Sequence, residues 1–168
     1  DDTARVALLH ARLAAYVRPD AIEADLLAAS ILESEGQFVL ATAALAEVPP
    51  ESPWFVVSEI HRANSQRAAG NAAGGIATLE ALAGSHPDQI EVQSALGDAL
   101  RTDNQFAAAV TAYTAAIELI DKPAAVHWVL YYTRGISNER AGNWDAAEAD
   151  FREALVLRPE QPLVLNYL

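Results

Sequence analysis

The sequence predicts an all-α chain that is built from repeated pairs of helices. Short corners that combine Gly or Asn with Gln or Asn begin at residues 36, 70, 104 and 142, so the steps between them are 34, 34 and 38 residues. Apolar residues on both sides of each corner follow the spacing of an amphipathic helix. A period of about 20–50 residues is typical of arrays in which each repeat packs on its neighbours. We therefore expect a single repeat array over residues 1–168.

The array is expected to contain four complete repeats and part of a repeat at each end. The predicted boundaries are 22–55, 56–89, 90–123 and 124–161 for the complete repeats. Residues 1–19 are expected to form the second helix of a preceding repeat, and residues 162–168 to begin the first helix of a further one. The apolar stripe expected in the first of these segments is Val6, Leu9, Leu13 and Tyr16 or Val17. Both ends then present apolar surface, so we expect the array to continue in a longer parent protein.

Within each complete repeat, the corner ends one helix and a proline limits the next. Gly or Asn readily adopts the left-handed conformation that closes a helix. Pro53, Pro87 and Pro159 each follow their corner residue by 17 positions, where proline cannot continue a helix. In the third repeat this position holds Asp121, and four additional residues lie nearby. Because four residues are close to one helical turn, we expect the first helix of the fourth repeat to begin one turn early, near Pro123.

Small residues stand at two fixed places in every complete repeat. They occur seven positions before the corner and five positions after it, and a bulky residue follows four positions later. This alternation predicts that the two helices of a repeat approach closely at the small residues, while the bulky residue fills the space beside them. The small residues are Ala29, Ala63, Gly97, Gly135, Ala41, Gly75, Ala109 and Ala147, and the bulky residues are Leu45, Leu79, Tyr113 and Phe151.

The composition disfavours several classes of function. The chain has 52% hydrophobic and 20% charged residues, so it can bury a core. Its formal net charge of −12 disfavours binding to nucleic acid, and its apolar runs are too short for direct insertion into a membrane. Cysteine is absent, which removes disulfides and thiolate metal sites. The compartment stays open between the cytoplasm and a bacterial periplasm or envelope, because a signal on a longer parent chain would lie outside this sequence.

No residue pattern in the sequence points to catalysis, a metal or a cofactor. The histidines at positions 10, 61, 86 and 127 are too far apart for a ligand pair on one helix. The glycines of the segment 69–75, AGNAAGG, lack the G-K-[ST] ending of a phosphate-binding loop and are better explained as a helix corner. We therefore predict that the chain is not an enzyme and has no catalytic residues, no metal site and no cofactor.

The spacing of these residues resembles the tetratricopeptide repeat, whose signature of about 34 residues combines Leu-Gly, aromatic, Ala and Pro positions. SALGDAL and AAAVTAYTAAI in the third repeat, and RGISNERAGNWDAAEADFREALVLRP in the fourth, match it well. The first two repeats replace Gly by Ala and the aromatic residue by Leu. The resemblance implies a right-handed solenoid whose first helices line a concave groove that holds a peptide segment or helix of another protein. The C-terminal part is also similar to long bacterial tetratricopeptide proteins of envelope or pilus assembly.

The resemblance also assigns the groove residues, because in this family the inner face presents side chains from particular turns of the first helices. In this sequence these are His61, Asn64, Arg67, Ser94, Asp98, Arg101, Tyr132, Thr133 and Arg140. Arginine suits carboxylates and Tyr132 offers a flat apolar ring, so our hypothesis is that the groove binds an extended, partly acidic segment. The alternative is that these are ordinary solvated side chains, with Arg62 and Arg134 paired to neighbouring acids.

Two functions stay open from the sequence. The first is a scaffold or adaptor module that binds another protein in the groove. The second is a structural spacer or self-association module, in which the exposed terminal helices of one copy stack on those of another. Sedimentation separates the two, because a monomer at all concentrations would argue against self-association.

Overall fold

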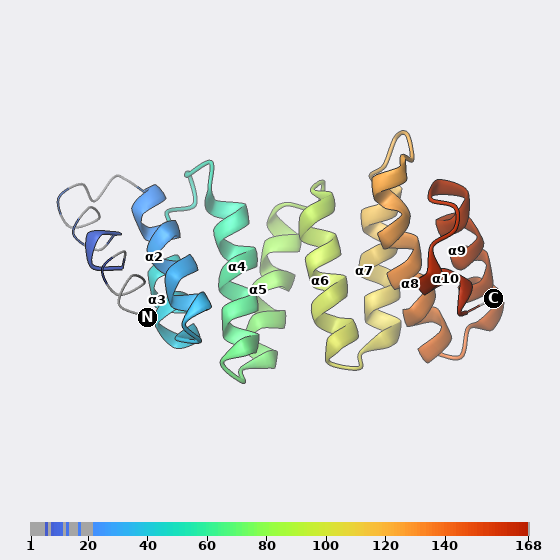
Figure 1. The fold of residues 1–168 in the computed structure, drawn as a ribbon, viewed down its shortest axis with the longest axis horizontal. Helices are drawn as coiled ribbons and strands as arrows, with labels where there is room; N and C mark the ends of the chain where they lie inside the picture. Colours follow the sequence, from blue (N-terminus) through green and yellow to red (C-terminus); the bar gives the residue numbers. More distant parts are fainter. Residues whose placement is uncertain (1–5, 7, 12, 14–16, 18–21, 168) are drawn as a thin grey trace. The chain divides into compact units, whose positions relative to one another are not determined.

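The computed structural model describes residues 6, 8–11, 13, 17 and 22–167, and over these residues every regular element is a helix (Figure 1). The chain divides into two compact units, residues 1–82 and 83–168, which we call the N-terminal unit and the C-terminal unit. The prediction of an all-α chain is confirmed over the described residues. The prediction of one continuous array with the boundaries given above stays a prediction.

The N-terminal unit consists of paired helices at the predicted places. The pairs are α2 (Ile22–Ser34) with α3 (Phe38–Leu45), and α4 (Phe55–Ala68) with α5 (Ala72–Ser85), whose last residues lie past the unit boundary. α3 packs against both α2 and α4. The described residues between 6 and 17 are helical. The predicted stripe residues Val6, Leu9, Leu13 and Val17 are half-exposed or more, and Tyr16 lies outside the described residues.

The C-terminal unit repeats this arrangement. α6 (Ile90–Thr102) pairs with α7 (Phe106–Glu118), and α8 (Trp128–Arg140) pairs with α9 (Trp144–Leu157). α7 packs against both α6 and α8. The short helix α10 (Pro162–Leu165) follows, and its Val164 is fully buried in a cluster with residues of α9. The segment predicted to begin a further repeat is therefore a single helical turn that covers part of α9.

The start of α8 differs from the prediction. α8 begins at Trp128, as far before its corner as α2 and α6 begin before theirs. The additional residues form an exposed connection and one 3₁₀ turn, η1 (Ala125–His127). Ala124 has an extended backbone, with φ −133° and ψ 167°, and its N–H donates to Nδ1 of His127 at 2.9 Å. An α-helix that starts near Pro123 would need a helical Ala124, so the prediction of an early α-helical turn was wrong.

The four predicted corners close their helices in the same way. Gly36, Gly70, Asn104 and Gly142 all have positive φ, between 62° and 89°. In each corner the following N–H donates to the carbonyl five residues earlier, as Asn143 does to Asn138 at 2.8 Å. The corner N–H donates to the carbonyl three residues earlier. These two hydrogen bonds together form the Schellman motif. The motif satisfies carbonyl groups at a helix end and favours residues that tolerate the left-handed conformation.

The eight small residues at the predicted contact positions are all buried. A methyl group on Gly97 would lie 2.7 Å from ring carbons of Tyr113, and one on Gly135 would lie 2.7 Å from the ring of Phe151. A methyl group on Gly75 would lie 2.6 Å from the carbonyl oxygen of Ala63. These distances leave no room for a side chain, so the predicted close approach of the paired helices is confirmed.

The sizes of the small and the bulky residue that face each other within a helix pair vary in opposite directions between the two units. In the C-terminal unit, Gly97 and Gly135 stand opposite aromatic rings. At the corresponding positions of the N-terminal unit, Ala29 and Ala63 accompany Leu45 and Leu79, and all four are at most 2% exposed. Where the small position holds Ala in place of Gly, the bulky position holds Leu in place of an aromatic residue. This keeps the packing density of each pair similar.

Candidate functional site

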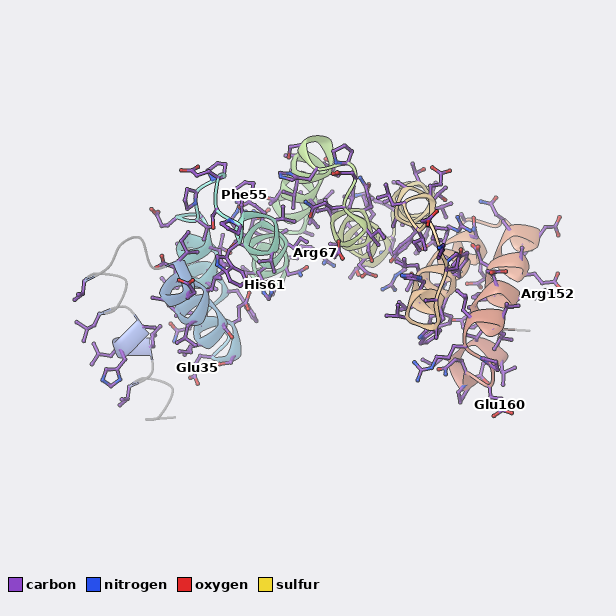
Figure 2. The ribbon with its side chains drawn as sticks, turned by 90° about the horizontal axis from the view of Figure 1, so that it is seen from above. Glu35, Phe55, His61, Arg67, Arg152 and Glu160 are labelled. Atoms are coloured by element: carbon purple, nitrogen blue, oxygen red, sulfur yellow. The ribbon has the colours of Figure 1, made fainter. Side chains whose placement is uncertain are left out.

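In the N-terminal unit, the predicted groove residues lie on α4, with His61 and Arg67 both visible in Figure 2. Nδ1 of His61 is 3.6 Å from Oε2 of Glu33 on α2, and Oγ of Ser65 donates to Oε1 of Glu33 at 2.6 Å. Glu33 therefore joins the two first helices of this unit. His61 and Glu33, together with Asn64 and Phe38, line a cavity of about 280 Å³ at this junction.

Arg67 is held on this surface without a carboxylate partner among the residues that the structure describes. Its Nη1 donates to Oδ1 of Asn64 at 3.3 Å. Its side-chain carbons lie against Gly75, where a methyl group would come within 2.5 Å of Cγ. The glycine thus lets the Arg67 stem cross α5 closely, and most donors of the guanidinium stay available to a ligand.

In the C-terminal unit, Asp98 and Arg101 of α6 form a hydrogen-bonded network with Tyr113 of α7. The Tyr113 hydroxyl donates to Oδ1 of Asp98 at 2.6 Å. Nε of Arg101 donates to the Tyr113 oxygen at 3.2 Å, and Nη2 of Arg101 donates to Asp98 at 3.3 Å. Burial and then Asp98 raise the pKa of Tyr113, so this hydroxyl stays protonated and donating at neutral pH. Arg101 is therefore fixed in place, while its Nη1 has no hydrogen bond to the described residues.

Tyr132 of α8 lies close to this network and within an aromatic cluster. Its ring centroid is 5.6 Å from that of Trp128, 6.2 Å from Phe151 and 6.0 Å from Tyr167. Burial raises the pKa of Tyr132, Tyr167 raises it further, and the positive charge of Arg101 acts in the opposite direction. The field of Arg101 thus reaches Tyr132, and α6 contacts α8. Asp98 and Arg101 on α6 and Tyr132 on α8 thus belong to two first helices of the C-terminal unit that contact each other.

The other predicted groove residues contribute less to this surface. Ser94 is half-buried on α6. The Thr133 hydroxyl donates to carbonyls of its own helix, to Val129 at 2.9 Å and to Leu130 at 3.2 Å. Arg140 is exposed, with its Nε 3.4 Å from Oε2 of the adjacent Glu139. The hydroxyl of Thr133 is therefore already used within the helix, and Arg140 is partly neutralised.

Two arginines of the first helices are paired internally, as the alternative reading expected. Arg62 donates through Nε to Glu59 at 2.6 Å, with a second bond from Nη2 to the same carboxylate. Arg134 donates to both carboxylate oxygens of Asp150, with a shortest distance of 2.6 Å, and Nη1 reaches Thr114 at 3.2 Å. The Arg134 network ties α7, α8 and α9 together, so these two arginines serve the fold.

Sequence reasoning missed that Glu33 contacts His61 and Ser65 in the N-terminal unit, and that the buried Tyr113 holds Asp98 and Arg101 in the C-terminal unit. Glu33 is not among the residues that the family pattern assigned to the groove, and Tyr113 belongs to a second helix. Either could have been found only by pairing residues across helices, since their contacts depend on side-chain direction. Across the described ranges, no group of three or more His, Asp or Glu side chains could hold a metal ion. None of the helices in these ranges combines the length and the hydropathy that a membrane span requires.

The comparisons with known proteins agree with this arrangement. Residues 128–161 match the family model of the tetratricopeptide repeat, and a comparison with curated protein sequences gave no match. Among solved structures, YrrB, a TPR protein with an unusual peptide-binding site, is similar with a TM-score of 0.73 and 14% identity, over 98% of this chain and 83% of that chain. MamA from Desulfovibrio magneticus RS-1 has a TM-score of 0.74 and 18% identity, over 95% and 88% of the two chains.

A chain in the structure of the APC/C hetero-tetramer Cut9-Hcn1 is similar with a TM-score of 0.64 and 16% identity, over 95% of this chain and 30% of that chain. At such identities the likeness concerns the fold. The predicted fold class, an all-α helical-repeat solenoid, is confirmed by these neighbours. The matched segment coincides with α8, α9 and the turn that leads to α10. The resemblance drawn from the sequence is therefore confirmed at the repeat in which its motif is most complete.

Proposed function

We infer that this chain, a tetratricopeptide-repeat protein by its segment 128–161 and by its fold, is a scaffold or adaptor module that binds a peptide segment or helix of another protein. The fold is typical of protein-interaction modules. Such a module acts through a preformed surface, because binding energy is not then lost in ordering the protein. We also infer that it is not an enzyme.

The observation that carries the proposal is the fixed position of Arg101 on α6, a helix that contacts the α8 helix of Tyr132. Arg101 is held by Asp98 and by the buried Tyr113, so its remaining donors point from a defined place. Tyr132 adds an aromatic ring, and aromatic and arginine side chains are the residues that dominate binding energy at interfaces. A backbone carbonyl or a carboxylate of a bound segment would find a donor and an apolar platform together.

The proposed preference for acidic segments depends mostly on the N-terminal unit. Asp98 balances the charge of Arg101, with the pair 3.3 Å apart and half-exposed. Arg67 is instead bonded to the neutral Asn64. We therefore propose that Arg67 of the N-terminal unit binds a carboxylate of a ligand. In the C-terminal unit, Arg101 and Tyr132 offer hydrogen bonding and apolar contact.

The test uses peptides that are selected on the wild-type chain from a phage-displayed library and then titrated by fluorescence anisotropy. Arg67→Glu and Arg101→Glu are expected to weaken binding of the selected peptides by about tenfold or more, because each replaces a donor by a repelling carboxylate. Selected peptides are expected to be enriched in Asp and Glu. Circular dichroism confirms that each variant is folded.

Lys122→Glu provides the matched control, because it makes the same change in charge on the exposed connection between α7 and α8. Its binding should equal that of the wild type once net charge is screened with salt. Equal binding by all three variants would remove the groove assignment.

The second candidate, a structural spacer or self-association module, is favoured by apolar residues on the terminal elements. Leu163 and Leu165 of α10 are 56% and 53% exposed, and Leu9 near the other end is 58% exposed. Analytical ultracentrifugation over a wide concentration range separates the candidates. A monomer throughout would argue against self-association, whereas a dimer that is lost on Leu163→Ser and Leu165→Ser would favour it.

A further inference from the structure

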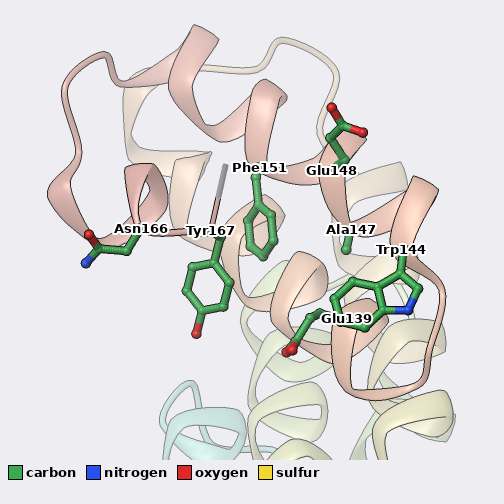
Figure 3. A pocket seen from close by; sticks show the side chains of 7 residues that line it. All are labelled: Glu139, Trp144, Ala147, Glu148, Phe151, Asn166 and Tyr167. Carbon is green, nitrogen blue, oxygen red and sulfur yellow. The ribbon is translucent and has the colours of Figure 1, made fainter.

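The third residue before each of the four corners is charged. The residues at this position are Glu33, Arg67, Arg101 and Glu139. In the C-terminal unit, both charges have a partner of opposite sign. Nη2 of Arg101 is 3.3 Å from Oδ1 of Asp98, and Oε2 of Glu139 is 3.4 Å from Nε of Arg140. Figure 3 shows Glu139 at a cavity of about 370 Å³ beside α9, so a place at a cavity does not by itself leave a carboxylate unpaired.

The two charges at this position in the N-terminal unit have no such partner among the residues that the structure describes. Nη1 of Arg67 on α4 donates to the neutral Asn64 at 3.3 Å. Oε1 of Glu33 on α2 accepts from the Ser65 hydroxyl at 2.6 Å, and Oε2 is 3.6 Å from Nδ1 of His61. His61 carries a charge only when it is protonated, so Glu33 has no lasting cationic partner. The unit therefore presents one carboxylate and one guanidinium that are each held by a neutral side chain.

The Glu33 carboxylate is held in place before any ligand arrives. Its partner Ser65 is 1% exposed, which fixes one carboxylate oxygen at the junction of α2 and α4. The Glu33 side chain is 24% exposed, so water reaches only part of it. A carboxylate that is partly desolvated and lacks a cation gains more from an ion pair than a fully solvated one does. Glu33 is therefore suited to binding a basic group that comes from outside the chain.

The cavity of about 280 Å³ at this junction gives a basic side chain room to reach Glu33. It is lined by Glu33, Phe38, His61, Asn64, Ser65 and Ala68. The lining contains no Lys or Arg, and it comes from both helix pairs of the N-terminal unit. The stem of a Lys or Arg side chain can pack on Phe38 and Ala68 while its charged head meets the carboxylate. Asn64 lines the cavity and also accepts from Arg67, so the guanidinium lies next to this site.

We propose that the segment bound by the N-terminal unit carries a Lys or Arg close to its acidic residue. Glu33 binds this basic side chain in the cavity, while Arg67 binds the carboxylate. This role of Glu33 rests on the proposed function, in which Arg67 meets a carboxylate of the ligand. The order of the two charges along the segment then fixes the direction in which it crosses α2 and α4, because the inverted placement sets like charges against each other. The net charge of −12 adds a long-range attraction for the basic residue.

The test repeats the phage selection at pH 8 on the wild-type chain and on Glu33→Gln, with one library of random peptides. Peptides selected on the wild type are expected to be enriched in Lys and Arg together with Asp and Glu. Selection on Glu33→Gln is expected to lose the enrichment in Lys and Arg and to keep that in Asp and Glu. The reason is that the amide cannot pair with a cation, although its oxygen still accepts from Ser65.

Two further variants make the result specific to Glu33. Glu35→Gln is the matched control, because it removes the same charge from an exposed residue two positions away, which Figure 2 labels. It should yield peptides of the wild-type composition. Arg67→Gln should instead lose the enrichment in Asp and Glu and keep that in Lys and Arg, which separates the two halves of the site.

A double-mutant cycle measures the contact directly. The basic residue of the tightest wild-type peptide is replaced by Gln, and both peptides are titrated by fluorescence anisotropy against the wild type and Glu33→Gln. Each single change is expected to weaken binding by about fivefold or more, and the two together by no more than either alone, because both remove one ion pair. If circular dichroism shows that Glu33→Gln is less folded, the two peptides on the wild-type chain still test the requirement for a basic residue.

Three results would each overturn the role of Glu33. These are wild-type peptides without enrichment in Lys and Arg, an unchanged enrichment on Glu33→Gln, and additive losses in the cycle. If Arg67→Gln still lowers the enrichment in Asp and Glu in those cases, the proposed function stands without this role. Failure to select any peptide on the wild-type chain contradicts the proposed function, and the role of Glu33 with it.

Discussion

At the scale of single residues, the absence of a side chain is what brings the helices of each pair in the C-terminal unit together. Gly135 leaves the space that the Phe151 ring occupies, and a methyl group there would lie 2.7 Å from the ring and 3.2 Å from Cβ of Asp150. Both neighbours are buried, so they cannot move aside without disturbing their own contacts. The packing of α8 on α9 therefore requires that residue 135 has no side chain.

We predict that Gly135→Ala lowers the free energy of unfolding by about 1–3 kcal/mol, because it overpacks the contact. Urea unfolding followed by circular dichroism measures this. Gly84→Ala is the control, because a methyl group on that helical glycine meets nothing within 4 Å. The control should leave stability equal or raise it by about 0.5–1 kcal/mol, since Ala favours helix more than Gly. Equal effects of the two substitutions would contradict the packing explanation.

A double variant tests the exchange of volume between facing positions. The N-terminal unit already uses Ala with Leu where the C-terminal unit uses Gly with an aromatic residue. We expect Gly135→Ala combined with Phe151→Leu to be less destabilised than the sum of the two single variants, by at least about 0.5 kcal/mol. Additive losses in the same urea experiment would show that the two positions do not share one space.

The buried Arg134–Asp150 pair leads to a third prediction. The Asp150 side chain is 6% exposed, and it also accepts from Asn138 at 3.0 Å. Asp150→Ala leaves the guanidinium of Arg134 desolvated and unpaired, so we expect a loss of about 3 kcal/mol in thermal or urea unfolding. Glu148→Ala breaks the exposed pair with Arg152 and should change stability by about 0.5 kcal/mol or less. A small effect of Asp150→Ala would mean that Arg134 finds solvent or another partner.

At the scale of elements, the α6–α7 pair depends on a tyrosine that must keep its proton. Burial and Asp98 raise the pKa of Tyr113, and Arg101 lowers it less. Above about pH 10, the normal pKa of tyrosine, the unfolded chain loses this proton while the native chain retains it. The unfolded state then binds fewer protons, so stability falls as pH rises.

We therefore predict that the wild-type chain and Tyr113→Phe converge in stability at high pH. At pH 8 the variant should be less stable by about 1 kcal/mol, since the bonds to Asp98 and Arg101 are lost. Between pH 9 and 11 the difference in melting temperature should shrink, because the phenylalanine cannot ionise. Tyr131 and Tyr132, whose pKa values burial also raises, are present in both proteins and serve as the internal reference. A constant difference over this pH range would contradict the assignment.

The elements also mark where sequence reasoning reached its limit. The corners at 36, 70, 104 and 142 could be predicted because a left-handed conformation favours Gly or Asn, which can be recognised in the sequence. The start of α8 could not, because a count of four residues does not tell a helical turn from an exposed connection with a 3₁₀ turn. The extended Ala124 and its bond to His127 decide that choice, and neither produces a pattern that can be recognised in the sequence.

The candidate site was predicted less completely than the fold. Asp98 and Arg101 are hydrogen-bonded on α6, which contacts the α8 helix of Tyr132, and their place in a groove stays a prediction. The internal use of Thr133 and the balance of Arg101 by Asp98 were not predicted. Both interactions depend on side-chain rotamers and on contacts between helices. The burial of the small residues, in contrast, depends only on their spacing within the repeat. The groove assignment therefore needs the binding experiment described above.

At the scale of the whole molecule, net charge governs association with other chains. The formal charge of −12 corresponds to a sequence pI near 4.6. We expect solubility to be lowest near that pH and to rise on either side, because self-repulsion disappears when net charge approaches zero. Turbidity of the purified chain between pH 4 and 8 measures this. A solubility minimum, which is seen as a turbidity maximum, far from pH 4.6 would indicate that specific contacts between exposed apolar residues, not charge, control association.

The exposed connection between α7 and α8 carries Lys122, the one lysine in the chain, which does not belong to the groove residues. An amine-reactive linker applied at high pH would therefore attach to one side chain. With the α-amino group blocked, the linker would tether every copy to a sensor surface by the same point and leave the groove residues chemically unmodified.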